Sequence, residues 1–224
     1  MKRRYQLLLI IIFGTVSAIY LSTVHVTSKI NYVAIGDSLA IGTTSSHVIG
    51  QSFNDYYKES LDAKKKLGEY NIDFSQSYLN IHTLNEYLNL NKIGCKSEKP
   101  IKQIIENASI LTIAIGEDEF IDLATKENLQ TSLEDKYLKE MKKLLQSIRE
   151  FYSGPITIIG LYPWQNFKTD DVYKINNNLK KLCISFKTSF IDLLSYSEYT
   201  DPENYFLNYI GHQKIASELM AIYN

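Results

Sequence analysis

The chain has 224 residues, a formal net charge of −1 and 45% hydrophobic residues. A balanced charge gives no reason to expect nucleic acid as a partner, and this apolar content excludes a disordered chain. After a leader of about 28 residues, the remaining length suits one domain with a full hydrophobic core. We therefore divide the chain into a leader over residues 1–28 and one domain over residues 29–224.

The leader has a basic run at residues 2–4, followed by an uncharged and mostly apolar span from Leu7 to Val24. At about 1.5 Å per residue, such a helix reaches about 27 Å, enough to cross the core of a bilayer. The basic flank should stay in the cytoplasm, with the domain on the extracytoplasmic side. We predict an N-terminal transmembrane helix that anchors the protein in the cell membrane. A signal peptide cleaved after Ala18 is the alternative, and it would give a secreted domain.

The first predicted strand of the domain is the apolar run Ile30–Ile35, which ends at Gly36. Its β-branched and aromatic residues are typical of a buried strand in a parallel sheet. Asp37 and Ser38 follow, so this serine lies at the carboxyl end of the strand, where open α/β sheets bind ligands. An ordinary turn, with glycine and aspartate chosen for backbone conformation, is the alternative interpretation.

Strands and helices alternate along the rest of the chain. Further strands are expected at 71–79, 109–115, 155–161 and 189–194, and helices at 52–67, 83–90, 99–107, 132–151, 170–186 and 208–222. The helix from Ser132 is the clearest, because Asp135 stands in capping-box register and apolar residues repeat every three to four positions. This alternation predicts an α/β fold, a three-layer α/β/α sandwich around a central, mostly parallel sheet.

Cysteine and histidine usage predicts no metal site and no cofactor. Cys95 and Cys183 could pair in an oxidising compartment, although Cys183 lies in an apolar helical pattern typical of a buried residue. The histidines show none of the short paired spacings of metal ligands. They are His25, His47, His82 and His212.

The stretch Gly36-Asp37-Ser38-Leu39, with Gly42 after it, resembles the first block of the SGNH (GDSL) hydrolase family. Residues 111–119 look like the third block of this family, and residues 205–216 look like the last. The resemblance runs from about residue 30 to the end of the chain. It implies a flavodoxin-like sandwich and an esterase or acylhydrolase whose serine works with a late histidine. The implied oxyanion hole uses the serine amide, a glycine amide and an asparagine side chain.

The last block departs from the family pattern. When Gly211 is matched to the late glycine of the family, Glu203 and Phe206 stand at the positions of the aspartate and the histidine. Phenylalanine cannot accept a proton, and a serine hydroxyl is a poor nucleophile without a neighbouring base. We interpret His212 as a residue at a helix start rather than a substitute base, because position rather than residue type makes a base.

The residues of the implied oxyanion hole depart from the pattern as well. Asp118 stands where the family has asparagine, and an ionised carboxylate can only accept hydrogen bonds. The second block lacks its glycine, and Ile81 is the best match to that position. We predict Ser38 as the catalytic residue, and we predict three oxyanion or ligand-binding residues: Asp37, Gly116 and Asp118.

Two functions of different classes follow from these residues. The favoured one is a membrane-anchored domain, impaired as a hydrolase, that binds a partner protein or an envelope ligand. The alternative is an active serine ester hydrolase that uses Ser38 with a non-standard base, His82 or His212. A cation site is a further alternative for the acidic group, although side chains adjacent in sequence mostly point in different directions. That group is Asp37, Glu117, Asp118 and Glu119.

Overall fold

The computed structural model describes residues 28–44, 48–124, 130–164, 167, 169–200 and 205–223. Five strands form one parallel sheet in the order β2-β1-β3-β4-β5. They are β1 (Ile30–Gly36), β2 (Leu67–Asn71), β3 (Ile110–Ala114), β4 (Ile156–Ile159) and β5 (Ser189–Ile191). The predicted membrane span and cleavage site lie outside the described residues. Within those residues, no helix is long and apolar enough to cross a membrane.

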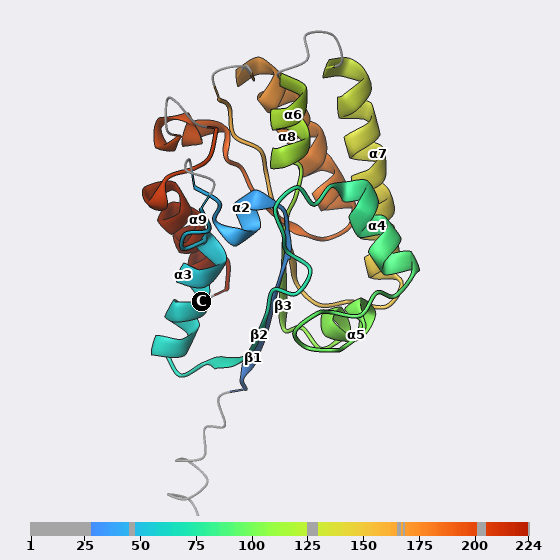
Figure 1. Cartoon of the computed structure of the whole chain (residues 1–224), viewed down its shortest axis with the longest axis vertical. Helices are drawn as coiled ribbons and strands as arrows, with labels where there is room; N and C mark the ends of the chain where they lie inside the picture. The colour runs from blue at the N-terminus through green and yellow to red at the C-terminus, as the bar shows by residue number, and fades with distance from the viewer. Residues whose placement is uncertain are drawn as a thin grey trace, which may run out of the picture.

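Helices lie on both faces of the sheet (Figure 1). On one face, α3 (Phe53–Ala63) packs against α9 (Tyr209–Tyr223). The other group of packed helices contains α4 (Ile81–Asn89), α5 (Ile101–Glu106), α7 (Gln130–Arg149) and α8 (Thr169–Ser185). Three short elements complete the described part of the chain: α2 (Ser38–Ile41), α6 (Glu117–Ala124) and the 3₁₀ helix η1 (Leu194–Tyr199). The predicted α/β fold with a parallel sheet is therefore confirmed.

The sheet forms the centre of the hydrophobic core. Every residue of β3 and of β4 is buried, as expected for strands covered by helices on both faces. The apolar stripe predicted for α7 faces the core. Four of its six residues are buried, and the other two, Leu133 and Phe151, are partly buried and pack against the core. The buried four are Tyr137, Met141, Leu144 and Ile148.

Three predicted elements differ clearly from the structure. The helix predicted at 52–67 ends at Ala63, and Leu67 already belongs to β2. The second strand was predicted at 71–79, but β2 ends at Asn71 and residues 72–79 form a loop along the end of β1. The apolar alternation in this loop has another cause, since Phe74 and Leu79 are buried there although only an isolated bridge, between Gly36 and Ser75, joins the loop to β1. The helix predicted to start at Ser132 begins two positions earlier, at Gln130, so Ser132 lies inside α7 rather than at its cap.

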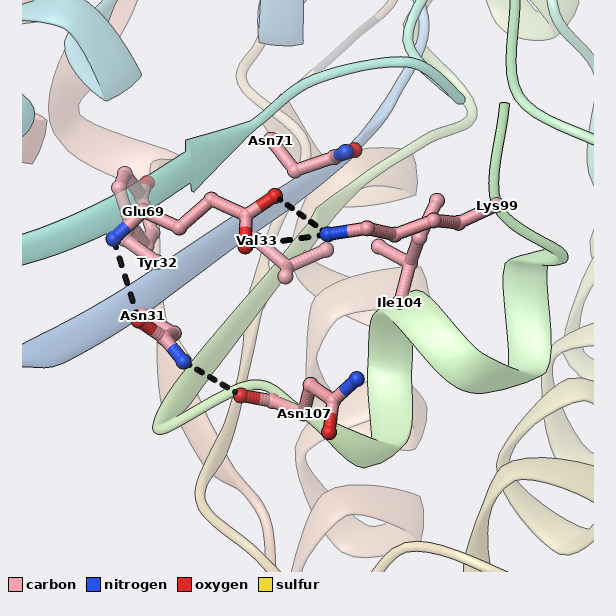
Figure 2. Close-up of a pocket in the computed structure, with 8 residues that line it drawn as sticks. All are labelled: Asn31, Tyr32, Val33, Glu69, Asn71, Lys99, Ile104 and Asn107. Atoms are coloured by element: carbon pink, nitrogen blue, oxygen red, sulfur yellow. Dashed lines mark hydrogen bonds and ion pairs between the residues drawn. The ribbon is translucent and has the colours of Figure 1, made fainter. Parts of the chain in front are cut away.

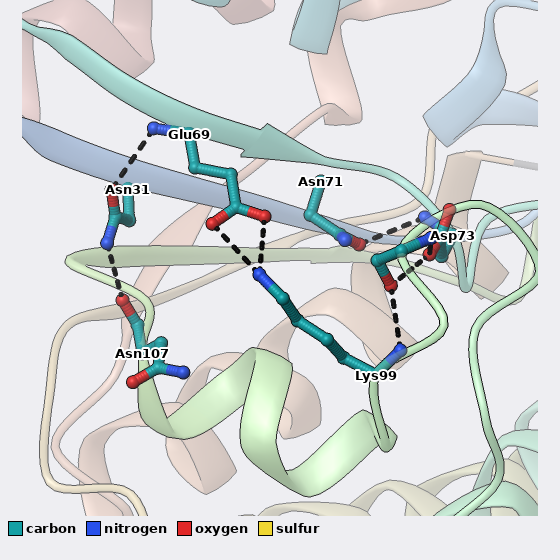
Figure 3. A network of polar contacts seen from close by, with 7 residues as sticks. Asn31, Glu69, Asn71, Asp73, Lys99 and Asn107 are labelled. Carbon is teal, nitrogen blue, oxygen red and sulfur yellow. Dashed lines mark hydrogen bonds and ion pairs between the residues drawn. The ribbon is translucent and has the colours of Figure 1, made fainter.

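A polar network joins α5 to the edge strand β2 on the amino-terminal side of the sheet (Figure 3). The Asn31 side chain donates to the Asn107 carbonyl at 3.1 Å and accepts from the Glu69 amide at 3.1 Å. Lys99 Nζ lies 3.1 Å from a carboxylate oxygen of Glu69. The cavity that these residues line measures about 10 Å³ (Figure 2), at the lower limit for one water molecule. We conclude that the network is structural.

Asp73 joins the loop that follows β2 to the segment between α4 and α5. Its Oδ2 accepts the Ser97 amide at 2.8 Å and also the Ser97 hydroxyl. The Asp73 amide donates to the side-chain oxygen of Asn71 at 3.1 Å, at the end of β2 (Figure 3). These bonds hold the loop at 72–79, which contains Asp73, against the segment that contains Ser97.

Candidate active site

The predicted serine lies where β1 ends. A Cβ on Gly36 would stand 1.8 Å from the carbonyl oxygen of Ala114 on β3, so only glycine fits this close approach. The Asp37 amide donates to the same oxygen at 2.9 Å. The Asp37 side chain caps α2 by accepting the Leu39 amide at 3.2 Å. Ser38 is therefore the first residue of a short helix at the carboxyl end of the sheet.

Two backbone amides converge on one oxygen of Asp118. The Ser38 amide donates to Asp118 Oδ2 at 3.1 Å, and the Tyr78 amide donates to the same oxygen at 2.7 Å. Asp118 is buried, with 5% of its surface exposed, and it lies in the first turn of α6. A side chain of the protein itself thus accepts both amides beside Ser38.

Tyr78, and not Ile81, provides the second converging amide. The Ile81 amide, at the start of α4, points to Glu119 Oε2 at 3.4 Å. Tyr78 has φ 60°, a left-handed conformation that favours glycine, and its side chain is exposed. Sequence reasoning missed Tyr78 because the predicted strand at 71–79 would have given this residue an extended backbone.

Asp37 links Ser38 to the loop between β3 and α6. Asp37 Oδ2 accepts the Gly116 amide at 2.7 Å and the Asp118 amide at 3.4 Å. Gly116 has φ 118°, so a side chain there would strain the backbone. Burial, followed by the nearby charge of Asp118, raises the pKa of Asp37, and its three amide donors oppose this rise. The structure thus brings all four predicted site residues together.

Glu117 also belongs to this cluster, although sequence analysis did not place it among the site residues. The Tyr162 hydroxyl contacts Glu117 Oε1 and lies 2.9 Å from the Tyr205 carbonyl oxygen. The phenol of Tyr162 thus lies between Glu117 and the loop before α9. Burial and then the charge of Asp37 raise the pKa of Glu117, and the hydrogen bond from Tyr162 opposes this rise. From the sequence, Glu117 stood out only as a member of the acidic group considered for a cation site.

The Ser38 hydroxyl forms no hydrogen bond with the part of the chain that the structure describes. His212 is buried beside α3, where its Nδ1 accepts the Phe53 amide at 3.2 Å and its ring stacks on the Phe53 ring. Burial lowers the pKa of His212 to about 4. This imidazole nitrogen is therefore already used as a structural acceptor.

The other predicted base positions do not supply an imidazole beside Ser38. The His82 side chain is 58% exposed and lies 3.6 Å from Glu86 on the same helix. Phe206 is buried at the position matched to the family histidine. His25, His47 and Glu203 lie outside the described residues.

No group of three histidine, cysteine or acidic side chains is arranged to hold a metal ion in the described ranges. The two cysteines are free, with Cys95 exposed and Cys183 buried as predicted, so the disulfide considered from the sequence is not formed. The site therefore consists of a serine, buried acidic side chains and converging backbone amides.

The profile of the GDSL-like lipase/acylhydrolase family matches residues 32–212. The chain belongs to this family. Among solved structures, the lipase Lip_vut3 from a goat rumen metagenome aligns with a TM-score of 0.69 and 19% identity, over 86% of this chain and 97% of that chain. A lipase/acylhydrolase from Enterococcus faecalis aligns with a TM-score of 0.61 and 14% identity, over 86% and 94%.

A variant of Axe2, an acetyl-xylooligosaccharide esterase from Geobacillus, aligns with a TM-score of 0.62 and 14% identity, over 87% of this chain and 94% of that chain. At these identities, the alignments establish a shared GDSL hydrolase fold. No curated protein sequence matches the chain.

Proposed function

We propose that this GDSL-family domain is impaired as an ester hydrolase and acts by binding a partner protein or an envelope ligand. The observation that supports this proposal is the Asp118 carboxyl group, whose Oδ2 accepts the Ser38 and Tyr78 amides. These amides correspond to the backbone donors that the family resemblance implies for the oxyanion hole. The negative oxygen of a tetrahedral intermediate would have to share its donors with another acceptor.

The charge of the Asp118 side chain adds to this effect. An asparagine amide at this position would donate a hydrogen bond to the developing oxyanion, whereas an ionised carboxylate repels it. Loss of a single oxyanion donor typically lowers kcat by about 10²–10³-fold. Here the donor is replaced by an acceptor in a buried setting where charges interact strongly.

The surroundings of the Ser38 hydroxyl support the same proposal. Nucleophilic catalysis by serine requires a base within hydrogen-bond reach. In the described part of the chain, Phe206 stands at the matched position, and His212 Nδ1 is engaged by the Phe53 amide. We propose that the pocket of the fold is retained for binding, while the proton transfer that starts acyl transfer is absent.

The proposed location is the extracytoplasmic side of the cell membrane. The support for this location is the sequence of the leader, with its basic run at residues 2–4 and its apolar span from Leu7 to Val24. A retained leader would tether the domain near envelope components, and a cleaved leader would release it.

A fluorophosphonate probe tests the proposed impairment. These probes label a serine only when it is activated as a nucleophile, so the full chain should stay unlabelled at concentrations that label an active GDSL esterase assayed beside it. The Ser38→Ala variant gives the background. Labelling of the native chain that disappears in Ser38→Ala would overturn the proposal.

An active serine ester hydrolase is the second candidate. Its support is membership of a family of lipases and acylhydrolases, the alignment with solved lipases and an esterase, and the retained Ser38. This candidate requires a base other than His82 or His212 as they lie here. Hydrolysis of p-nitrophenyl acetate by the native chain, abolished in Ser38→Ala, would favour it over the impaired domain.

A further inference from the structure

The two edges of the sheet differ in charge. The three residues before each strand include lysines and no acidic residue, whereas the three residues after each strand include acidic residues and no basic one. The lysines are Lys29 before β1, Lys64, Lys65 and Lys66 before β2, and Lys187 before β5. The acidic residues are Asp37, Asp73, Glu117 and Asp192. Positive charge therefore collects at the edge opposite Ser38.

Four of these lysines gather where β1 and β2 begin, at the lower end of the sheet in Figure 1. Lys29 Nζ donates to the Lys65 carbonyl at 2.9 Å, and the Ile30 amide donates to the Lys66 carbonyl at 2.8 Å. Lys29, Lys64 and Lys65 are exposed, and Lys66 is half-buried. We call these four residues the lysine corner.

Little negative charge opposes the lysine corner. Asp62 is exposed in the last turn of α3, and Glu69 on β2 is already paired with Lys99 at 3.1 Å. Within the described residues, no ion pair joins Lys29, Lys65 or Lys66 to a carboxylate. The dipole of α3 favours lysines at its carboxyl end, but Lys29 precedes a strand and is not explained in this way.

The leader joins the domain at the same corner. Residues 25–29 separate Ile30, the first residue of β1, from the predicted membrane span, which ends at Val24. A fully extended chain from Val24 to Ile30 reaches at most about 20 Å. Lysines held this close to a bilayer are attracted by anionic lipid headgroups.

We propose that the lysine corner docks on the anionic headgroups of the bilayer that the leader spans. This inference rests on the location given under the proposed function and deepens it. β1 has seven residues and is about 23 Å long. Turning the Ser38 edge toward the same bilayer would lift the start of β1 further than the tether reaches. The Ser38 site therefore takes its ligand from the side away from the membrane, and not from the lipids of its own bilayer.

Energy transfer from the protein to labelled lipid headgroups tests this orientation. The full chain, with Cys95→Ser to remove the exposed thiol, is reconstituted into vesicles of phosphatidylcholine mixed with phosphatidylglycerol. A fluorophore is attached at Ser153→Cys, in the exposed segment before β4, or at Gln76→Cys. Gln76 is exposed at the other edge, where its amide bonds to the Gly36 carbonyl at 3.0 Å. We expect stronger transfer from position 153 than from position 76.

The lipid and the salt concentration separate docking from tethering. In vesicles of phosphatidylcholine alone, or at high salt, the lysine corner should lose its attraction, and transfer from position 153 should fall. These two measurements need no change in the lysines, so they do not depend on how a variant folds. Equal transfer from the two positions, or transfer that is independent of lipid charge, would overturn the inference.

The triple variant Lys29→Gln, Lys65→Gln, Lys66→Gln locates the attraction. Each lysine near an anionic surface contributes about a fivefold factor, so the ratio of docked to undocked domain should fall by about 10²-fold. Circular dichroism checks that the variant is folded. Unchanged transfer from position 153 in the folded variant would also overturn the inference.

A second triple variant removes the same charge elsewhere. Lys136→Gln, Lys139→Gln and Lys142→Gln change exposed residues of α7, and transfer from position 153 should stay as in the native chain. An equal fall in both triple variants would show that net charge, rather than the lysine corner, directs the domain, and would contradict the inference.

The two proposals fail in different ways. A chain that does not remain with the vesicles would overturn both the proposed location and the docking. A vesicle-bound chain with equal transfer from the two positions would overturn the docking alone. Fluorophosphonate labelling that depends on Ser38 would overturn the proposed impairment and leave the orientation of the domain in place.

Discussion

Asp118 and Asp37 hold each other in place beside Ser38, because the Asp118 amide donates to Asp37 Oδ2 at 3.4 Å while Asp118 Oδ2 accepts the Ser38 amide at 3.1 Å. Both side chains are buried. Burial, and after it the nearby charge of Asp118, raises the pKa of Asp37. The protonation of Asp37 therefore depends on whether the side chain at position 118 carries a charge.

Replacing Asp118 with asparagine should lower the pKa of Asp37 and of Glu117. The charge of Asp118 is a cause of the raised pKa at both residues, after burial and, for Glu117, after the charge of Asp37. Carboxyl ¹³C NMR titrations of the native chain and of Asp118→Asn measure this directly. The Glu69→Gln variant is the control, and it should leave both values in place. Identical titration curves in Asp118→Asn would show that the carboxyl groups are not coupled.

Restoring three family residues together should create Ser38-dependent esterase activity. Tyr78→Gly supplies a residue suited to φ 60°. Asp118→Asn supplies a donor for the oxyanion, and Phe206→His supplies a base. The triple variant should exceed the Tyr78→Gly, Phe206→His double variant by about 10²–10³-fold in kcat, the usual effect of one oxyanion donor. The assay is p-nitrophenyl acetate hydrolysis.

Adding Ser38→Ala to the triple variant provides the control and should abolish its activity. Circular dichroism checks that each variant is folded. A folded triple variant with no Ser38-dependent turnover would contradict the view that these three positions account for the impairment.

The sequence predicted the parts of the fold that are encoded locally. The run Ile30–Ile35 followed by Gly36 became β1, because buried β-branched residues and a terminal glycine specify a strand and its end. β2 was misplaced because it is an edge strand in which only Asn71 is buried, so its residues carry no apolar pattern. The sequence could not point to Tyr78. Its left-handed backbone occurs together with a hydrogen bond from its amide to the distant Asp118, and a tyrosine side chain does not indicate such a conformation.

The chemistry of the site was predictable from residue types only in part. Asp118 was identified as an acceptor in place of a donor, but the sequence does not show that its Oδ2 accepts the Ser38 and Tyr78 amides. Likewise, Glu117 joined the cluster through Tyr162, a contact between residues 45 positions apart. Such contacts depend on how the loops meet at the sheet edge, which periodicity does not encode.

Asp73 should contribute more to stability than its exposed neighbour Glu69. Asp73→Ala leaves the Ser97 amide without its partner in a partly buried loop, and we expect a loss of about 1–3 kcal/mol in the free energy of unfolding. Glu69→Ala removes an ion pair whose side chains are 41% and 51% exposed, which typically changes stability by about 0–1 kcal/mol. Urea denaturation of both variants makes the comparison, and an equal loss would contradict it.

His212 should make the folded state less stable as the pH falls from about 6.5 to about 4. Burial lowers its pKa in the folded state to about 4, from the usual value of about 6.5 for histidine. The unfolded chain therefore binds more protons between these values, and stability falls with pH across this window. His212 contributes about 3 kcal/mol to the free energy of unfolding when the pH lies above its pKa in the unfolded chain. This contribution is lost once the pH has fallen to its pKa in the folded state.

The His212→Gln variant isolates this contribution, because glutamine keeps an acceptor for the Phe53 amide but does not titrate. Asp37 and Glu117 have raised pKa values and act in the opposite direction, since their folded forms bind more protons and gain stability as the pH falls. Both remain in the variant, and so does Asp55, whose charge acts on His212. The difference in unfolding free energy between the native chain and His212→Gln should therefore shrink as the pH falls through this window, and a constant difference would show that His212 is not held neutral.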